Sequence, residues 1–427
     1  MKSKLSITIK KRSQTSWQIW MMIMLMLFSN MLISFFGFPW SVRYLMDVVW
    51  ITSIAIIILN YHKIDSKGIN NLVYWIVLFL IVTLLVYMVQ YQSALYYLWG
   101  FRNNFRFYAA FFLFALFLKN QDIENYLRVF DKLFWLNAAI SLVQYFAFGI
   151  KGDYLGGIFG AESGVNGYTN IFFVVVITKS IVYCIEKKET SKVCISKCIA
   201  ALYVAALAEL KFFFVEFAVI LIMAIMLTEF TWRKFAIILG GIAGLSVCTA
   251  LLMELFPVFD GWFSFDRMFA TASNDKGYTG TGDLNRMTAI SRINELWLTN
   301  VGLRLFGLGL GNCDTSSFAL VNTPFYEQYG HMHYTWMSYS FMYLECGWIG
   351  LIFYFGFFAL VYLAIGRIER SADPKMKSCC CVSKILAICC TIISIYNGSL
   401  RTEAGYMAYF VLAIPFALNR DSMRKIR

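Results

Sequence analysis

The chain has 427 residues, of which 59% are hydrophobic and 18% are aromatic, whereas only 15% are charged. Soluble domains carry about 25% charged residues, and the apolar residues here cluster in long runs, so a soluble globular protein is excluded. The formal net charge is +12, and we assign the excess Lys and Arg to cytoplasmic loops instead of a nucleic-acid-binding surface. The sequence therefore predicts an all-α polytopic membrane protein.

About twelve apolar segments are candidates for membrane spans. Their approximate ranges are 17–36, 44–60, 71–90, 105–118, 133–149, 168–185, 198–209, 212–228, 235–255, 336–363, 385–399 and 404–419. The fourth, seventh, eleventh and twelfth are short, so tilted, broken or re-entrant helices are alternatives to full spans there. Most Lys and Arg residues fall in inner connections when the N-terminus is cytoplasmic. We therefore expect both termini in the cytoplasm.

One connection is much longer than the others. Residues 257–333 lie on the outer side in this topology, and long loops in compact proteins are usually functional. The loop divides the chain into an N-terminal bundle of about nine spans (1–256), a large extracytoplasmic loop with the candidate active site (257–333), and a C-terminal bundle of about three spans (334–427).

Basic residues on the outer face oppose the usual orientation bias. They include Arg102, Arg106, Lys211, Arg267, Arg286, Arg292 and Arg401. Arginine offers a planar fork and lysine a point charge, and both suit recognition of a diphosphate at the mouth of a helix bundle. The alternative is that these side chains extend to lipid headgroups or pair with Glu209, Glu295 and Glu403.

A helix is predicted within the long loop over residues 284–297, because apolar residues recur there at helical spacing. Asp283 is the expected N-cap of this helix. Arg286 and Arg292 would lie about 240° apart around its axis. They would therefore approach a ligand from two sides and not along one stripe.

Two of the three histidines, His331 and His333, directly precede the tenth predicted span, and Glu345 lies inside that span. Histidine suits the removal of a proton from a sugar hydroxyl near neutral pH, although interfacial hydrogen bonding is the alternative role. Asp283, Glu295 and Glu345 are rival bases. Glu345 also begins "ECGWIG", which predicts a glycine-marked helix break that the carboxyl group would stabilise.

The segment "GLGLG" at residues 307–311 superficially resembles a nucleotide-binding loop. It lacks the Lys-Ser or Lys-Thr ending of a P-loop, and no strand–turn–helix unit surrounds it. We therefore expect its glycines to permit a tight turn and close approach of the backbone to a ligand or a neighbouring helix.

Three segments in order, "NRMTAISRINELW", "LFGLGLGNCDTSSF" and "HMHYTWMSYSFMYLECGWIGLIFY", resemble Wzy-type polysaccharide polymerases, in the group that includes O-antigen ligases. Weaker similarities are "YLWGFRNNFRFYAAFF", "GGIFGAESGVNGYTN" and "AELKFFF". By residues the resemblance is specific only over about 285–355, whereas by hydropathy it covers most of the chain. It implies a GT-C-like architecture with one large outer loop late in the chain.

The resemblance implies glycosyl transfer at the outer face of the bacterial cytoplasmic membrane. A glycan linked to undecaprenyl diphosphate would be moved onto the next lipid-linked repeat unit, building capsular, O-antigen or exopolysaccharide chains. The candidate residues are His333, His331 and Arg286 for catalysis and Arg292, Lys211, Arg401 and Glu345 for substrate binding. This chemistry requires no metal and no cofactor. The expected partners are the lipid-linked glycan and membrane lipids, with a flippase and a chain-length regulator as candidate protein partners and no nucleic acid.

Three alternatives accompany this prediction. An O-antigen ligase would use the same chemistry with a different acceptor, and Lys211, where ligases tend to carry arginine, favours the polymerase. A flippase or other transporter would show repeat symmetry and charges near the middle of several spans, whereas the central charges here are chiefly Lys179 and Glu216. A passive partner of other polysaccharide enzymes is the third alternative.

Overall fold

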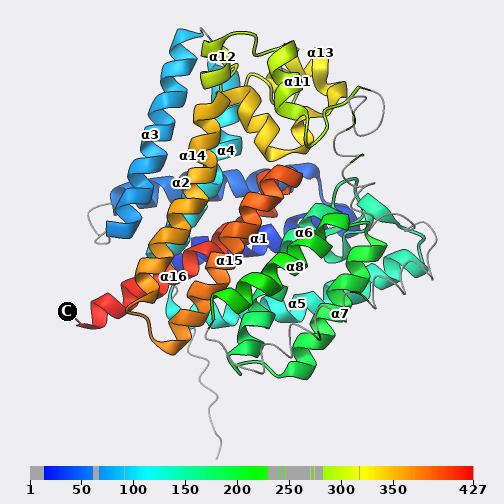
Figure 1. Ribbon diagram of the computed structural model, residues 1–427, viewed down its shortest axis with the longest axis vertical. Helices are drawn as coiled ribbons and strands as arrows, with labels where there is room; N and C mark the ends of the chain where they lie inside the picture. Colours follow the sequence, from blue (N-terminus) through cyan, green and yellow to red (C-terminus); the bar gives the residue numbers. More distant parts are fainter. Residues whose placement is uncertain are drawn as a thin grey trace, which may run out of the picture.

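A computed structural model of the chain describes residues 14–60, 67–90, 92–228, 282–316 and 318–426, with four isolated positions between 229 and 281. These residues form helices and no strand (Figure 1). The helices are α1 (Gln14–Phe36), α2 (Leu45–Leu59), α3 (Lys67–Val89), α4 (Ala94–Phe117), α5 (Asn120–Phe146), α6 (Asn166–Ile185), α7 (Ser191–Leu207), α8 (Lys211–Met226), α11 (Ala289–Leu296), α12 (Val301–Phe306), α13 (Pro324–Tyr329), α14 (Ser338–Glu369), α15 (Pro374–Tyr396) and α16 (Gly405–Ile426).

The helices have the length and composition of a membrane protein. Six in the described residues are long and apolar enough to cross a bilayer: Thr15–Phe36, Trp40–Leu59, Gly68–Val89, Asn166–Ile185, Ser338–Glu369 and Pro374–Tyr396. The hydrocarbon of a bilayer offers no hydrogen-bond partners to backbone N–H and C=O groups. A helix pairs these groups internally and is therefore the expected spanning element. Leu85 and Val89 of α3 remain exposed, as side chains facing lipid would. The all-α membrane class is confirmed.

Each predicted span coincides with an observed helix, except the ninth (235–255), which lies outside the described residues. The helices that match the short fourth and eleventh spans are longer than predicted. Helix α4 begins at Ala94 and α15 at Pro374, each about eleven residues before the expected start. The predicted spans begin after Arg102 and Lys384, whereas the helices begin before them, because these two side chains find acidic partners inside the protein.

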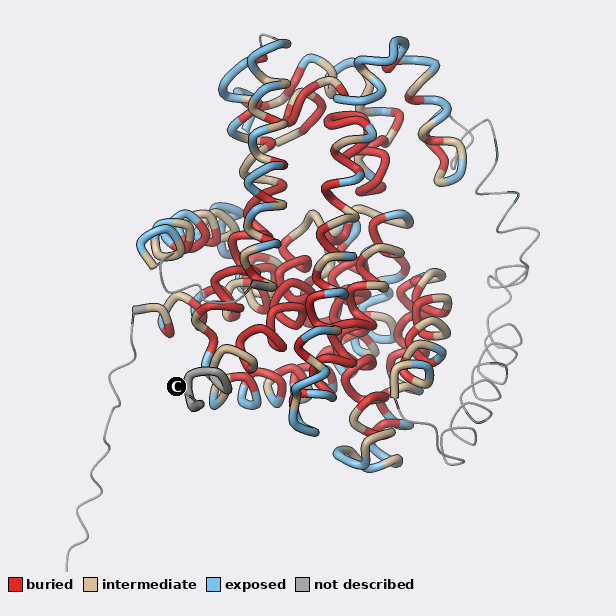
Figure 2. The backbone as a smooth tube through the Cα atoms, turned by 60° about the vertical axis from the view of Figure 1, so that its left-hand side comes forward, coloured by how far each residue is buried: buried red, intermediate tan, exposed pale blue. Residues whose placement is uncertain are grey.

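The interior is formed by α4, α6, α14, α15 and α16, which pack against one another along their lengths. Aromatic rings supply much of the contact: the ring of Tyr409 lies 5.6 Å from that of Phe107 and 5.7 Å from that of Phe357. Buried positions concentrate where the helices meet, and the ends of the molecule are mostly exposed (Figure 2). A well-packed bundle thus carries the loops at its ends.

We call the described residues 283–336 the cap; its three short helices α11, α12 and α13 lie together at one end of the bundle (Figure 1). An aromatic cluster joins the end of α11 to α13: the ring of Phe325 lies 5.1 Å from that of Trp297 and 5.4 Å from that of Tyr334. The part of the long loop before the cap, residues 257–281, lies almost entirely outside the described residues.

The predicted helix at 284–297 is shorter than expected, and the N-cap prediction is wrong. Helix α11 begins at Ala289 after a turn at residues 286–288, so Asp283 does not cap it. The reason is a tertiary hydrogen bond: the backbone N–H of Leu284 donates to the carbonyl of Met332 at 2.9 Å. This bond holds the residues before α11 in a non-helical conformation. Arg286 therefore lies in the turn and not on the helix.

The glycine-marked break in the tenth span is confirmed at Gly347, where φ is 61° and ψ is −160° inside α14. The "GLGLG" segment packs into this break. The N–H groups of Leu308 and Gly309 donate to the carbonyls of Leu344 and Glu345, each at 2.9 Å. The expectation of close backbone approach to a neighbouring helix is therefore confirmed, and the cap is fixed to the membrane helix by main-chain hydrogen bonds.

Candidate functional site

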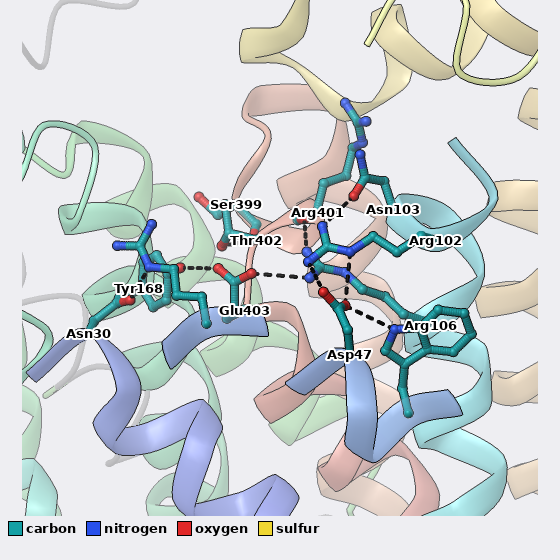
Figure 3. A network of polar contacts seen from close by, with 12 residues as sticks. Asn30, Asp47, Arg102, Asn103, Arg106, Tyr168, Ser399, Arg401, Thr402 and Glu403 are labelled. Carbon is teal, nitrogen blue, oxygen red and sulfur yellow. Dashed lines mark hydrogen bonds and ion pairs between the residues drawn. The ribbon is translucent and has the colours of Figure 1, made fainter. Parts of the chain in front are cut away.

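A pocket with a volume of about 520 Å³ lies between the cap and the membrane helices. It is lined by Trp40, Arg43, Tyr44, Trp99, Arg102, Asn103, Asp314, Thr315, Ser316, Thr335, Gly398, Arg401, Thr402 and Glu403. A fourth arginine, Arg106, is buried behind this lining and bonds to two members of it. We call it the arginine pocket; Figure 3 shows the polar network on its walls.

Arg102 of α4 connects α2 to the cap through a chain of polar contacts. Its Nε and one terminal nitrogen donate to the two carboxylate oxygens of Asp47, both at 2.9 Å, in a bidentate pair. The other terminal nitrogen donates to Asn103 Oδ1 at 2.6 Å, and Asn103 Nδ2 donates to Asp314 Oδ2 at 2.6 Å. A bidentate pair fixes direction as well as distance. This series of hydrogen bonds therefore fixes the position of Asp314 in the cap relative to α2 and α4.

Arg106 holds the loop of residues 397–404 between α15 and α16. It donates to Glu403 Oε1 at 3.1 Å and to the Arg401 carbonyl at 2.9 Å. The Tyr168 hydroxyl of α6 donates to Glu403 Oε2 at 2.6 Å. Burial alone would raise the pKa of Glu403, but the charge of Arg106 and the Tyr168 hydrogen bond outweigh it and lower that pKa to about 2. Glu403 is therefore an ionised anchor between α4, α6 and this loop (Figure 3).

Arg43 forms the opposite wall of the arginine pocket. It donates to Glu162 at 2.8 Å and to Asn30 of α1 at 3.0 Å. Its guanidinium lies 3.7 Å from the ring centroid of Trp40, a cation–π contact. Trp40 is more than half exposed, so this wall presents both a cation and a flat apolar ring.

Arg401 differs from the other arginines of the network. One terminal nitrogen lies 3.6 Å from Asp314 Oδ2, beyond hydrogen-bond distance, and the guanidinium lies 3.5 Å from the ring centroid of Phe341. Its Nε is buried and has no hydrogen-bond partner among the described residues. Arg401 thus lines the pocket with donor capacity that the protein does not use, which is what an anionic ligand needs.

The cap wall at Asp314 is supported from behind by Glu345. Glu345 is fully buried, and the N–H of Cys313 donates to its Oε1 at 3.2 Å. The Tyr334 hydroxyl donates to the Cys313 carbonyl at 2.7 Å. At Gly311, where φ is 85°, a Cβ would overlap the Tyr96 carbonyl of α4, so only glycine permits this approach. Glu345 therefore acts behind the wall and does not line the pocket.

Comparison with known proteins adds no assignment to this geometry. No protein-family model matches the chain, and no curated protein matches it. The resemblance to polysaccharide polymerases stays a prediction from the sequence segments quoted above. What the pocket is able to bind must be derived from its own side chains.

Two predicted site residues, Arg286 and Lys211, lie near Tyr396 at the end of α15: Arg286 contacts it directly, and Lys211 is next to Phe212, which does. Arg286 Nε donates to the Tyr396 carbonyl at 3.0 Å, and its guanidinium lies 4.2 Å from the Tyr396 ring centroid. Phe212, next to Lys211, stacks on the Tyr396 ring at 3.9 Å. Neither cation lines the arginine pocket, but both lie beside the start of the loop that forms its floor.

The two predicted histidines lie at the edge of the cap. His331 is exposed, and the half-buried His333 ring stacks on Trp336 with 3.9 Å between centroids. His333 adopts a left-handed conformation, with φ 53°. Thr335, two residues further on, lines the arginine pocket, but neither histidine does.

Arg292 lies on the exposed face of α11, where it pairs with Glu295 at 3.0 Å. This is the surface ion pair that we named as the alternative to ligand binding, and the Arg106–Glu403 pair is another. Of the outer cations proposed for substrate binding, the structure therefore brings Arg401 into the pocket and leaves Arg292 outside it.

Sequence reasoning missed several residues of the pocket lining, among them Trp40, Arg43, Trp99 and Asp314. It also missed the two carboxylates that pair with lining arginines, Asp47 and Glu162. One signal for them was present. Arg102 and Arg106 are four residues apart in "FRNNFR", so they share one helix face. Two arginines on one face of an apolar helix need acidic partners, and Asp47, near the start of the second predicted span, was a candidate.

Proposed function

We propose that this chain is a membrane glycosyltransferase that polymerises undecaprenyl-diphosphate-linked oligosaccharide repeat units at the outer face of the bacterial cytoplasmic membrane. The observation that carries the proposal is the arginine pocket, whose lining combines Arg401, 3.6 Å from the Asp314 carboxylate, with the exposed ring of Trp40. Residues of the pocket come from both the membrane bundle and the cap, so a lipid-linked substrate would reach it from the bilayer side.

The chemistry of the pocket supports glycosyl transfer from a diphosphate donor. When a sugar leaves its lipid diphosphate, negative charge develops on the departing oxygen, and fixed cations stabilise that charge. Arg401 and Arg43 supply such cations at the pocket surface. Trp40 and Trp99 offer flat apolar faces against which sugar rings pack. A pocket of about 520 Å³ is in the range of small-molecule sites, about 300–1,000 Å³.

The contact between two quoted segments also supports the proposed family. "LFGLGLGNCDTSSF" and the "ECG" of α14 meet through main-chain hydrogen bonds at the helix break, and the residues that follow the glycines line the pocket. Two of the three segments that carry the resemblance therefore belong to one structural unit. That unit positions Asp314, Thr315 and Ser316.

The decisive experiment incubates the purified full-length chain, in lipid nanodiscs, with undecaprenyl-diphosphate-linked oligosaccharides extracted from the cells that produce it. A ladder of longer lipid-linked glycans is the expected product. Single glycans moved to another lipid core would identify a ligase instead. Movement of the oligosaccharide across a vesicle membrane without new bonds would identify a transporter. If the chain neither forms a product nor moves the oligosaccharide, only the function of an assembly partner would remain.

The orientation has its own test. Leu320 in the cap is 82% exposed, and the cysteines of the described residues are buried or half-buried, so Leu320→Cys adds one accessible thiol to this part of the chain. A membrane-impermeant maleimide should label it in intact cells. Labelling only after permeabilisation would show that the cap lies in the cytoplasm and would contradict the proposed function.

A further inference from the structure

The identity of the general base follows from the carboxylates of the arginine pocket, given the proposed function on which this inference rests. Two acidic side chains line the pocket, Asp314 and Glu403, and its described lining contains no histidine. We propose that Asp314 is the catalytic base that takes the proton from the acceptor hydroxyl. Arg401, with a nitrogen 3.6 Å from the same carboxylate, binds the diphosphate that leaves.

Glu403 is unsuited to this role. One of its oxygens accepts from the Arg106 guanidinium and the other from the Tyr168 hydroxyl. A charged donor at hydrogen-bond distance stabilises the ionised form, in agreement with a pKa of about 2. A group that binds protons so weakly removes one from a sugar hydroxyl inefficiently.

Asp314 has a different set of partners. Oδ1 accepts from the backbone N–H of Thr315 at 2.9 Å, and Oδ2 accepts from the Asn103 amide at 2.6 Å. Both donors are neutral, and the terminal nitrogen of Arg401 lies 3.6 Å from Oδ2, beyond hydrogen-bond distance. Each carboxylate oxygen accepts about two hydrogen bonds, so each keeps capacity for an incoming hydroxyl. The two existing bonds fix the direction in which the carboxylate points.

The transfer step balances with these groups. The acceptor oxygen forms a bond to the anomeric carbon of the donor glycan as its proton passes to Asp314. The bond between that carbon and the diphosphate oxygen breaks, and the diphosphate leaves with the electron pair and the negative charge, which Arg401 offsets. Asp314 then returns the proton to solvent. The step involves no oxidant, reductant or further reactant.

The test uses the same purified full-length chain, with the extracted lipid-linked oligosaccharides as substrate and undecaprenyl diphosphate as a separate binding probe. Asp314→Asn keeps the size and hydrogen-bonding shape of the side chain but cannot take the proton. A general base contributes about 10²–10⁴-fold to rate, so Asp314→Asn should lower the turnover rate at least about 100-fold. Its affinity for undecaprenyl diphosphate should stay within about threefold of wild type, because Arg401 remains.

Three further variants make the result specific. Asp122→Asn, the same exchange in the first turn of α5, lies beyond the far end of α4 and should leave the rate unchanged. Asp314→Glu should restore part of the turnover with an altered pH profile. His333→Gln should retain turnover, because His333 does not line the pocket.

The outcomes separate this inference from the proposed function. An active wild type with an Asp314→Asn variant within threefold of its rate would overturn the base assignment and leave the glycosyltransferase standing. Joint loss of turnover and undecaprenyl diphosphate binding in Asp314→Asn would also overturn it, because Asp314 would then shape the site and not accept the proton. A wild type that forms no new glycosidic bond would overturn the proposed function itself.

Discussion

Two buried networks of charged side chains occur along helix α6, and they differ in the space that they enclose. Near its start, Tyr168 joins the network of the arginine pocket, which surrounds about 520 Å³. Eleven residues later, about 16 Å along the helix, Lys179 pairs with Asp131 of α5, which also binds Lys197 of α7 at 2.8 Å. The cavity beside Lys179 has a volume of only about 10 Å³.

Buried charge alone therefore does not mark a functional site. In the Lys179–Asp131–Lys197 network, which we call the lysine network, the two ammonium groups share Asp131, Lys197 also pairs with Glu189 at 3.0 Å, and apolar side chains close the remaining space. In the arginine pocket the guanidinium groups are also paired, but a guanidinium has five donors, and those of Arg401 are not all used. Open volume next to unused donors is what permits a ligand.

Among the variants that compare the two networks, removal of the Arg401 side chain should give the largest effect on activity. A hydrogen bond to a charged group contributes about 1.5–3 kcal/mol, so Arg401→Ala should weaken undecaprenyl diphosphate binding about 10–100-fold and lower ladder formation at least as much. Arg401→Lys should lose less, because it keeps the charge without the planar fork. Binding and turnover assays on the same preparations measure both. Wild-type values for Arg401→Ala would mean that the pocket does not bind the diphosphate.

Breaking the lysine network should lower stability and leave activity intact. Asp131→Asn leaves the buried Lys179 without a carboxylate and Lys197 with Glu189 alone, at a cost of about 3 kcal/mol. Denaturant unfolding of the purified chain should report this loss, with the turnover per folded molecule unchanged. A stable but inactive Asp131→Asn variant would contradict the division of roles between the two networks.

Acid should weaken the arginine pocket through Glu403. Its folded pKa of about 2 lies below the ordinary value of about 4.3, so its ionised form stabilises the fold above pH ~5, and this contribution is lost as pH falls toward 2. Unfolding of the wild type and of Glu403→Gln should therefore differ by a constant free energy above pH ~5. The difference should shrink below that, and a difference independent of pH would contradict the ionised anchor.

Removing Arg292 should have the smallest effect. Its partner Glu295 is 60% exposed at the side chain, and exposed ion pairs contribute about 0–1 kcal/mol. Arg292→Ala should keep both unfolding free energy and ladder formation close to wild type. A strong loss of activity would indicate that the substrate binds at the exposed face of α11, as the sequence-based prediction for Arg292 implied.

The sequence anticipated the class of fold and some of its details. The helix break at Gly347 was predicted, because a glycine within a helix is a local signal. The "GLGLG" glycines were expected to approach a ligand or a neighbouring helix, and the structure shows that they approach helix α14. The start of α11 was misjudged, because a hydrogen bond from Leu284 to Met332, distant in the chain, overrides the local helical pattern. Arg401 was proposed as a ligand-binding cation and lines the pocket.

By itself, the amino-acid sequence determined that this chain forms apolar helices, because hydropathy and the need to satisfy backbone groups in hydrocarbon are local properties. Only the tertiary structure decided which charged residues meet. Arg106 and Glu403 are 297 residues apart, and Arg43 and Glu162 are 119 apart. No local pattern encodes such pairings: each arginine is held by a carboxylate from another segment, and the packing of helices selects which carboxylate that is.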